Sequence, residues 1–281
     1  MTAQTALNLA TRSLAKLDQP SGEAVLLLAH ACKLSPTAII AHPERVLRLS
    51  EQLHFRWYLI RRARGQPLAY ITGEREFYGH TFKVTRHTLI PRPDTETIID
   101  EALAVIDKFK LNQMLDIGTG SGCIAISLAL SNPKINVIAT DTSAHALRTA
   151  RLNVKRYKLE NRIRLVKGHL LDPLQQGQLS RSSLLVANLP YLSSTEISAE
   201  LKFEPSAALI ASEGGLGLYR ELLVQIHSLN SKFCPQHILF EAHPPTINGL
   251  SNIAKNIFPD CQIQIISDLA NKPRILGLSL A

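Results

Sequence analysis

From residue 94 onward the chain alternates between strand-like and helix-like segments, and this alternation limits its fold more than any other feature. Short apolar runs bounded by polar or glycine-rich segments predict strands, and apolar residues three and four positions apart predict helices. The expected strands are residues 113–117, 136–140, 163–167, 183–188 and 237–242. The expected helices are residues 94–108, 122–131, 143–159, 215–229 and 246–257. Such an alternation is typical of an α/β fold with a parallel sheet.

The end of this region departs from the alternation. Two further expected strands, residues 261–267 and 274–280, are joined by a short polar turn. A parallel pair needs a crossover of about a dozen residues or more, so these two strands must be antiparallel. The predicted α/β fold is therefore a seven-stranded sheet with an antiparallel last strand.

The segment that precedes this sheet, residues 1–73, has helical features only and predicts a small helical bundle. A stripe of apolar residues runs from Leu7 to Leu17, and Pro20-Ser21-Gly22 is expected to break the helical pattern. Further helices are expected at residues 24–32, from Ser35 onward and at residues 51–64. The arginines of this segment, which form either a solvated face or a docking surface for a partner, are Arg56, Arg61, Arg62 and Arg64.

Between the bundle and the sheet, residues 76–90 carry β-forming residues around a glycine and predict a hairpin or a bulged ribbon. Pro91-Arg92-Pro93 then predicts a stiff, extended connector. The expected domains are a helical domain at residues 1–73, a hairpin and linker at residues 74–93, and an α/β domain at residues 94–281.

The charge of the chain indicates the class of its partners. Its 281 residues carry a formal net charge of +8, and the isoelectric point is near 9.4. This charge favours an acidic protein, a ribosome-associated partner or RNA, without choosing among them. Cations crowd residues 148–167 in particular, where they form either a solvated face or a docking surface for an acidic protein or ribosomal RNA.

Composition also indicates the compartment. Apolar residues make up 45% of the chain, yet no apolar run approaches the roughly 20 residues of a membrane span, and the N-terminus lacks a secretory pattern. The scattered cysteines, without metal-ligand spacing, are Cys32, Cys123, Cys234 and Cys261. We therefore expect a cytoplasmic protein with reduced cysteines, no membrane association and no metal site.

A glycine-rich loop, residues 116–122 with the sequence Asp-Ile-Gly-Thr-Gly-Ser-Gly, lies between an expected strand and an apolar helix. Glycines let the backbone approach a ligand, and a helix start supplies free N–H groups. Asp141 ends the next strand, where an acid can bind both hydroxyls of a ribose. The loop has no lysine, and its glycine spacing differs from that of dinucleotide-binding loops. It predicts a site for a nucleoside-like ligand without a pyrophosphate; the alternative is an ordinary tight turn.

The tetrapeptide Asn188-Leu189-Pro190-Tyr191 follows another expected strand. Asn188 offers a side-chain oxygen as an acceptor, Leu189 offers a carbonyl that the next proline keeps out of regular pairing, and Tyr191 offers a ring face. These groups suit a planar NH2 group, either of an amide or of an adenine. A plain proline turn after a strand has the same sequence features.

The glycine loop, Asp141 and the Asn-x-Pro-Tyr tip share one edge of the expected sheet, and together they resemble the S-adenosylmethionine-dependent methyltransferases that methylate amino groups. Three further segments make the resemblance narrower, namely residues 66–74, 89–96 and 203–209. They are similar to segments of the bacterial peptide chain release factor glutamine methyltransferases. The similarity runs nearly end to end, and Arg92–Glu96 is its most specific part.

This resemblance implies an enzyme that transfers a methyl group from S-adenosylmethionine to the side-chain nitrogen of the glutamine in the Gly-Gly-Gln loop of a translation release factor. Separately, we expect residues 1–73 to recognise the substrate, and we expect a monomer that acts close to the ribosome or to RNA. The residues that the resemblance assigns to the cofactor are Gly118, Thr119, Gly120, Ser121, Gly122, Asp141, Leu170 and Asn188. Those that it assigns to the substrate glutamine are Asn188, Leu189, Pro190 and Tyr191.

Two positions depart from the family pattern. Leu189 stands where the family usually has a proline, and His169 stands where an aspartate is common before the adenine-lining residue. Asn-Leu-Pro-Tyr is also the form found in enzymes that dimethylate adenine in ribosomal RNA. An N6-adenine methyltransferase acting on RNA or DNA is therefore the alternative function, and a cofactor-binding module without turnover is a third.

Overall fold

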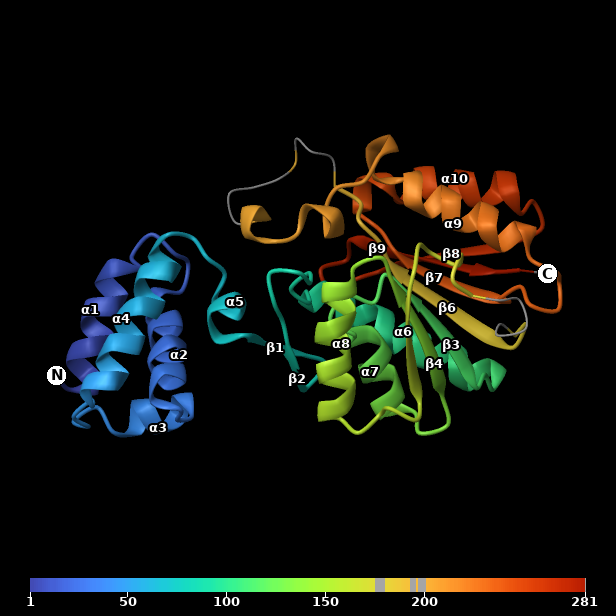
Figure 1. The fold of residues 1–281 in the computed structure, drawn as a ribbon. Helices are drawn as coiled ribbons and strands as arrows, with labels where there is room; N and C mark the ends of the chain where they lie inside the picture. Colours follow the sequence, from blue (N-terminus) through green and yellow to red (C-terminus); the bar gives the residue numbers. More distant parts are fainter. Residues whose placement is uncertain (175–179, 193–195, 197–200, 281) are drawn as a thin grey trace. The chain divides into compact units, whose positions relative to one another are not determined.

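The computed structural model describes residues 1–174, 180–192, 196 and 201–280, and Figure 1 shows its helices and strands. The described residues form two compact units. The first unit is Met1–Glu74 with a short segment that ends at Phe203, and the second contains the other described residues. In the described part of the chain, no helix is both long and apolar enough to cross a membrane.

The first unit is the expected helical bundle. Its helices are α1 (Ala3–Ser13), α2 (Pro20–Cys32), α3 (Pro36–Ala41), α4 (Leu49–Ala63) and α5 (Leu68–Thr72). Small residues on α1, such as Ala6, pack against Leu27 of α2 and Phe55 of α4 in one apolar core. Hydroxyl side chains cap two of the helices, Thr2 at α1 and Ser35 at α3.

The boundaries of the first two helices differ from the prediction. Helix α1 ends at Ser13, before the end of the apolar stripe, and α2 begins at Pro20 rather than at Ala24. The prediction that Pro20 lies in a break between helices is wrong because proline suits the first position of a helix, where no N–H is needed.

Two of the four arginines expected on a solvated face have partners within the first unit. Arg62 forms an ion pair with Glu23. The guanidinium of Arg61 lies 4.3 Å from the ring centre of Trp57 and donates to Gln66 Oε1 at 2.8 Å. These contacts connect α4 to its neighbours, so both side chains contribute to the bundle itself.

A seven-stranded sheet forms the centre of the second unit, as Figure 1 shows. Its strands are β3 (Gln113–Ile117), β4 (Asn136–Asp141), β5 (Ile163–Lys167), β6 (Ser183–Asn188), β7 (His237–Glu241), β8 (Gln262–Ser267) and β9 (Pro273–Ser279). The strand order is β5-β4-β3-β6-β7-β9-β8. Strands β3 to β7 pair in parallel, and β9 is antiparallel to β7 and β8. The predicted sheet is confirmed, and its order reverses between β3 and β6.

Helices cover both faces of this sheet (Figure 1). One face carries α6 (Glu96–Phe109), α7 (Cys123–Ser131) and α8 (Ala144–Arg156), and the other carries α9 (Gly217–Ser228) and α10 (Ile247–Ile257). Along β6, Leu184 and Val186 face the core beneath α6 and α7. Leu185 and Ala187 face the core beneath α9 and α10. A strand with two buried faces needs apolar residues at every position, which explains the continuous apolar run before Asn188.

The expected hairpin consists of β1 (Glu74–Phe77) and β2 (His80–Lys83). Phe77 and Phe82 anchor it in the core beneath α6 and α7. The connector after it is extended only as far as Arg92, because a short 3-10 helix, η1 (Pro93–Thr95), leads directly into α6. The prediction of an extended conformation is therefore wrong at Pro93, which again occupies a first helical position.

Candidate active site

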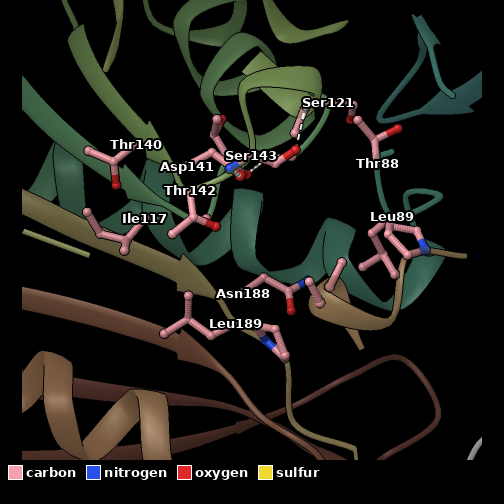
Figure 2. Close-up of a pocket in the computed structure, with 18 of the residues that line it drawn as sticks. Thr88, Leu89, Ile117, Ser121, Thr140, Asp141, Thr142, Ser143, Asn188 and Leu189 are labelled. Carbon is pink, nitrogen blue, oxygen red and sulfur yellow. Dashed lines mark hydrogen bonds between the residues drawn. The ribbon is translucent and has the colours of Figure 1, made fainter. Parts of the chain in front are cut away.

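A pocket lies at the carboxyl ends of β3, β4 and β6, where the strand order reverses. Open α/β sheets bind their ligands at such a point. Figure 2 shows Ile117 and Asp141 on one side of this pocket and Asn188 with Leu189 on another. The rest of the lining comes largely from two segments outside the sheet, within residues 87–95 and 205–208.

The glycine loop closes the pocket at the end of β3. Gly118 and Gly120 have positive φ angles of 78° and 57°, and the N–H groups of Gly118 and Thr119 both donate to the Thr140 carbonyl at 2.9 Å. A Cβ at Gly118 would lie only 3.0 Å from Cδ2 of Leu189. The loop therefore brings β3, β4 and β6 together at a position where only glycine fits.

The five predicted loop residues do not all reach the pocket. Gly118, Thr119, Gly120 and Ser121 line it, whereas Gly122 does not. Gly122 precedes α7 with a φ of 81°, and a Cβ there would lie 3.3 Å from side-chain atoms of Ala150 and Ile126. Close packing between α7 and α8 therefore accounts for this glycine.

Asp141 is held by the backbone at the end of β4. Its Oδ2 accepts from the N–H of Gly120 at 2.9 Å, and its Oδ1 accepts from the N–H of Ser143 at 2.8 Å. Partial burial raises the pKa of this carboxyl, while the two backbone hydrogen bonds lower it. Each carboxylate oxygen can accept more than one hydrogen bond, so the fixed Asp141 keeps acceptor capacity toward the pocket that it lines.

Asp116, one residue before the end of β3, supports the glycine loop. It is buried and accepts a hydrogen bond from the Thr119 hydroxyl at 2.6 Å. Burial raises the pKa of Asp116 to about 6. Among the described residues no group of three or more His, Cys, Asp or Glu side chains has the arrangement of a metal site.

Asn188, at the end of β6, has a defined side-chain orientation. Its Nδ2 donates to Glu241 Oε2 at 2.8 Å and lies 3.4 Å from the Thr95 hydroxyl. The Thr95 hydroxyl in turn donates to Glu241 Oε1 at 3.1 Å. Because both contacts engage the NH2 end of the amide, the Oδ1 end remains an acceptor, and Asn188 lines the pocket.

Leu189 is buried, and its backbone contacts the hydroxyl of Tyr219. The N–H of Leu189 donates to this hydroxyl at 3.2 Å, and the Leu189 carbonyl lies at the same distance from it. The hydroxyl also contacts the Glu241 carbonyl. A phenol has one hydrogen and a carbonyl has two lone pairs, so the Leu189 carbonyl keeps acceptor capacity although it is not free as expected.

The same contact explains how the chain tolerates leucine at this position. A proline has no N–H and could not donate to Tyr219. Leu189 therefore loses the stiffness of a proline ring and gains a hydrogen bond to a buried hydroxyl, which fixes the same turn by other means.

Tyr191, like Gly122, is a predicted site residue that the structure does not bring to the pocket lining. Its ring stacks on His243, with ring centres 5.8 Å apart and planes 3° from parallel. Burial raises the pKa of Tyr191 to about 12. Pro190, in contrast, lines the pocket together with Asn188 and Leu189.

The two residues predicted near the adenine both line the pocket. Leu170 has a positive φ of 46°, and its carbonyl accepts from the Thr140 hydroxyl at 3.1 Å. His169, which departs from the family pattern, has its Nε2 at 2.8 Å from Glu221 Oε1.

Sequence reasoning assigned no site role to the segment before α6, yet His87, Leu89, Arg92 and Thr95 line the pocket. Glu204 holds this segment, because it pairs with Arg92 and its Oε2 accepts from the N–H of Ile90 at 3.0 Å. Two of the three segments that narrowed the family resemblance, residues 89–96 and 203–209, thus meet beside the pocket. Both segments contain prolines and charged residues, and this shared composition was the signal that could have assigned them to the site.

Comparisons with known proteins give matches in both units. Residues 5–73 match the family model described as PrmC N-terminal domain, and residues 98–220 match the model described as Methyltransferase small domain.

Several curated relatives carry the name Release factor glutamine methyltransferase. The one from Moorella thermoacetica is 40% identical over 228 residues, which cover 79% of this chain and 80% of the relative. The one from Chlorobaculum tepidum is 36% identical over 258 residues, covering 88% and 87%. The one from Rhodopirellula baltica is 33% identical over 274 residues, covering 94% and 90%.

Solved structures share the fold at lower identity. The hMettl16 catalytic domain in complex with MAT2A 3'UTR hairpin 6 has a TM-score of 0.60 and 17% identity, covering 80% of this chain and 82% of that one. The N-terminal domain of human METTL16 in complex with SAH has a TM-score of 0.54 and 19% identity, covering 73% and 77%. At such identities the likeness concerns the fold alone.

Proposed function

This chain belongs to the release factor glutamine methyltransferase family, and we propose that it methylates the side-chain nitrogen of the glutamine in the Gly-Gly-Gln loop of a peptide chain release factor. S-adenosylmethionine is the methyl donor. The observation that carries the proposal is the orientation of Asn188, whose NH2 end is engaged by Glu241 and whose oxygen end is left for a ligand's NH2 group. A glutamine side chain has such a group.

The residues of the glycine loop fit the cofactor. Gly118 and Gly120 line the pocket without side chains, so a ligand can approach the loop backbone closely. Asp141 keeps acceptor capacity toward the pocket, as ribose hydroxyls require. Leu170 offers an apolar wall beside it. We assign the ribose to Asp141, the adenine to Leu170, and the remainder of the cofactor to the loop from Gly118 to Ser121.

Methyl transfer to an amide nitrogen depends more on the position of the reacting atoms than on proton transfer. When bound, S-adenosylmethionine supplies a methyl group on a positively charged sulfur, which needs no further activation. An amide nitrogen is a weak nucleophile, so its orientation decides the rate. Asn188 Oδ1 and the Leu189 carbonyl would each accept one hydrogen of the glutamine NH2 group and stabilise positive charge that develops on its nitrogen. The proton leaves afterwards, without a dedicated base.

Pro190 and Tyr191 would act on the substrate in different ways. Pro190 lines the pocket and would contact the glutamine directly. Tyr191 stacks on His243 instead, so we assign to it the support of the turn that presents the Leu189 carbonyl.

The first unit would recognise the release factor. It carries exposed apolar side chains at Leu49, Leu53, Trp57 and Ile60, all on α4 at spacings of three or four residues. Such a stripe is typical of a surface that binds another protein. Steady loss of affinity for the release factor with rising salt would indicate that the positive charge of the chain contributes as well.

One experiment tests the function directly. Labelled S-adenosylmethionine is offered in parallel to a release factor, to the same factor with its loop glutamine replaced, and to ribosomal RNA. We expect label on the unaltered release factor only. Label on the RNA would support the adenine methyltransferase instead, and cofactor binding without any label would indicate a module without turnover.

A further inference from the structure

Glu241 is a buried carboxyl group beside the substrate side of the pocket, and no role has so far been assigned to it. It ends β7, directly opposite Asn188 in the register between β6 and β7. Only 1% of Glu241 is exposed. A buried carboxylate is costly unless its oxygens are hydrogen-bonded, so its partners indicate what it does.

Each oxygen of Glu241 has its own side-chain partner. Oε2 accepts from Asn188, and Oε1 accepts from Thr95. An ionised carboxylate accepts hydrogen bonds and cannot donate. The opposite orientation of the Asn188 amide would bring its oxygen against a carboxylate oxygen, and two acceptors repel each other. The ionised Glu241 therefore selects one of the two amide orientations.

We propose that Glu241 is a positioning residue, which in its ionised form turns the oxygen of Asn188 toward the substrate and in its protonated form releases that orientation. This inference rests on the proposed function, because the orientation matters only if the ligand presents an NH2 group. It extends that function by naming a residue that does not touch the substrate and acts through Asn188.

Groups on several elements around Glu241 affect its pKa. Burial raises the pKa of Glu241 to about 7, against the lowering effects of Thr95 and of Arg274 on β9. Asp94 of η1 adds a raising effect, and Arg274 pairs with both Asp94 and Asp268.

Three further titratable groups near Glu241 are neutral near pH 7 because burial raises their pKa values. Burial raises the pKa of Cys123 on α7 and of Tyr191 to about 12, and it raises that of Tyr219 on α9 as well. Elsewhere in the site, burial raises the pKa of Asp116 to about 6. An acid limb alone would therefore not identify Glu241, and variants are needed.

Protonation reverses the role of the carboxyl group. A protonated Glu241 has an O–H group that can donate to Asn188 Oδ1, so the flipped amide is no longer repelled. A flipped Asn188 presents hydrogens to the pocket, where the substrate NH2 group also presents hydrogens. We expect activity to fall as the pH decreases through about 7, because the productive orientation is then lost.

The test compares pH profiles of kcat on a release factor for the wild type, Glu241→Gln and Thr95→Val. Glutamine at position 241 is neutral at every pH and permits both orientations, so we expect kcat to fall about tenfold at about pH 8 and the acid limb near 7 to vanish. Thr95→Val removes a hydrogen bond that favours the ionised form, so its acid limb should move to higher pH. Glu160→Gln, at an exposed carboxyl of the same unit, is the control and should keep the wild-type profile.

A second readout does not depend on turnover. The side-chain amide of Asn188 can be followed by NMR during a pH titration of the protein without cofactor or substrate. We expect its resonances to shift with a midpoint near the pKa of Glu241, and not to shift in Glu241→Gln. An acid limb in Glu241→Gln identical to that of the wild type, or Asn188 resonances that do not respond near that pH, would overturn the inference. A wild type that methylates no release factor, with a responding Asn188, would refute the proposed substrate and leave the coupling intact.

Discussion

Asp141 and Glu241 each end a strand of the central sheet, β4 and β7. Their carboxyl groups are held in different ways. Asp141 is partly exposed and accepts from the backbone N–H groups of Gly120 and Ser143. Glu241 is buried and accepts from the side chains of Asn188 and Thr95. Backbone donors cannot turn away, so Asp141 is a fixed acceptor. Side-chain donors can rotate, so the state of Glu241 can change what Asn188 presents.

The difference separates the two halves of the pocket by function. We assign the cofactor to the fixed acceptor Asp141. We assign the substrate amide to Asn188, whose own orientation is selected by Glu241. Three substitutions test whether the halves are independent.

The largest effect is expected at Asn188. Asn188→Ala removes an acceptor that stabilises charge developing on the substrate nitrogen, so kcat should fall by roughly a hundredfold or more. The affinity for S-adenosylmethionine, measured by calorimetry, should weaken much less because Asp141 and the glycine loop are untouched. Turnover close to that of the wild type would refute the role of Asn188.

The next effect is expected at Asp141 and should have the opposite pattern. Asp141→Asn replaces a carboxylate oxygen by an NH2 group, which cannot accept a hydrogen bond from a backbone N–H or from a ribose hydroxyl. Cofactor affinity should fall about tenfold to a hundredfold, while kcat at saturating cofactor stays within a few-fold of the wild type. A loss confined to kcat would contradict the separation of the two halves.

The smallest effect is expected at Gly118, which lies between the halves. Gly118→Ala combines a strained φ of 78° with a Cβ 3.0 Å from Leu189, so it should lower the free energy of unfolding by about 1–2 kcal/mol and impair both cofactor affinity and turnover. Gly79→Ala is the matched control because Gly79 has a φ of 71° and no atom within 4 Å of the added Cβ. Chemical denaturation of both variants isolates the contribution of the Leu189 contact, and equal losses would show that this contact is unimportant.

Much of the fold could be predicted because its signals are local. Apolar runs located all seven strands of the central sheet to within a residue or so, and a short turn determined the antiparallel end of the sheet. Proline was the main source of error. Pro20 and Pro93 each begin a helical segment. From the sequence, Pro20 was expected in a break between helices and Pro93 in an extended connector.

The site could be predicted only in part, because half of it depends on contacts between distant residues. The glycine loop, Asp141 and Asn188 each follow a strand directly, and strand ends meet at one edge. Glu241 lay in an expected strand and was given no role. The signal was available, because Glu241 is a single acid after an apolar run, as Asp116 and Asp141 are. Its hydrogen bond with Thr95 joins residues 146 positions apart. The orientation of Tyr191 toward His243 likewise depends on a partner far along the chain.

The order of the last two strands in the sheet affects how the chain can pair while it is being synthesised. Strand β9 is made after β8 but inserts between β7 and β8, so β7 keeps an unpaired edge until the residues from Pro273 to Ser279 have been synthesised. An open edge of this kind can pair with a foreign strand. The nascent chain therefore exposes this edge of β7 after β8 has been made and before β9 is available to pair with it. The Glu241 carboxyl group, at the end of that open strand, can reach its final environment only after Arg274 has arrived beside it.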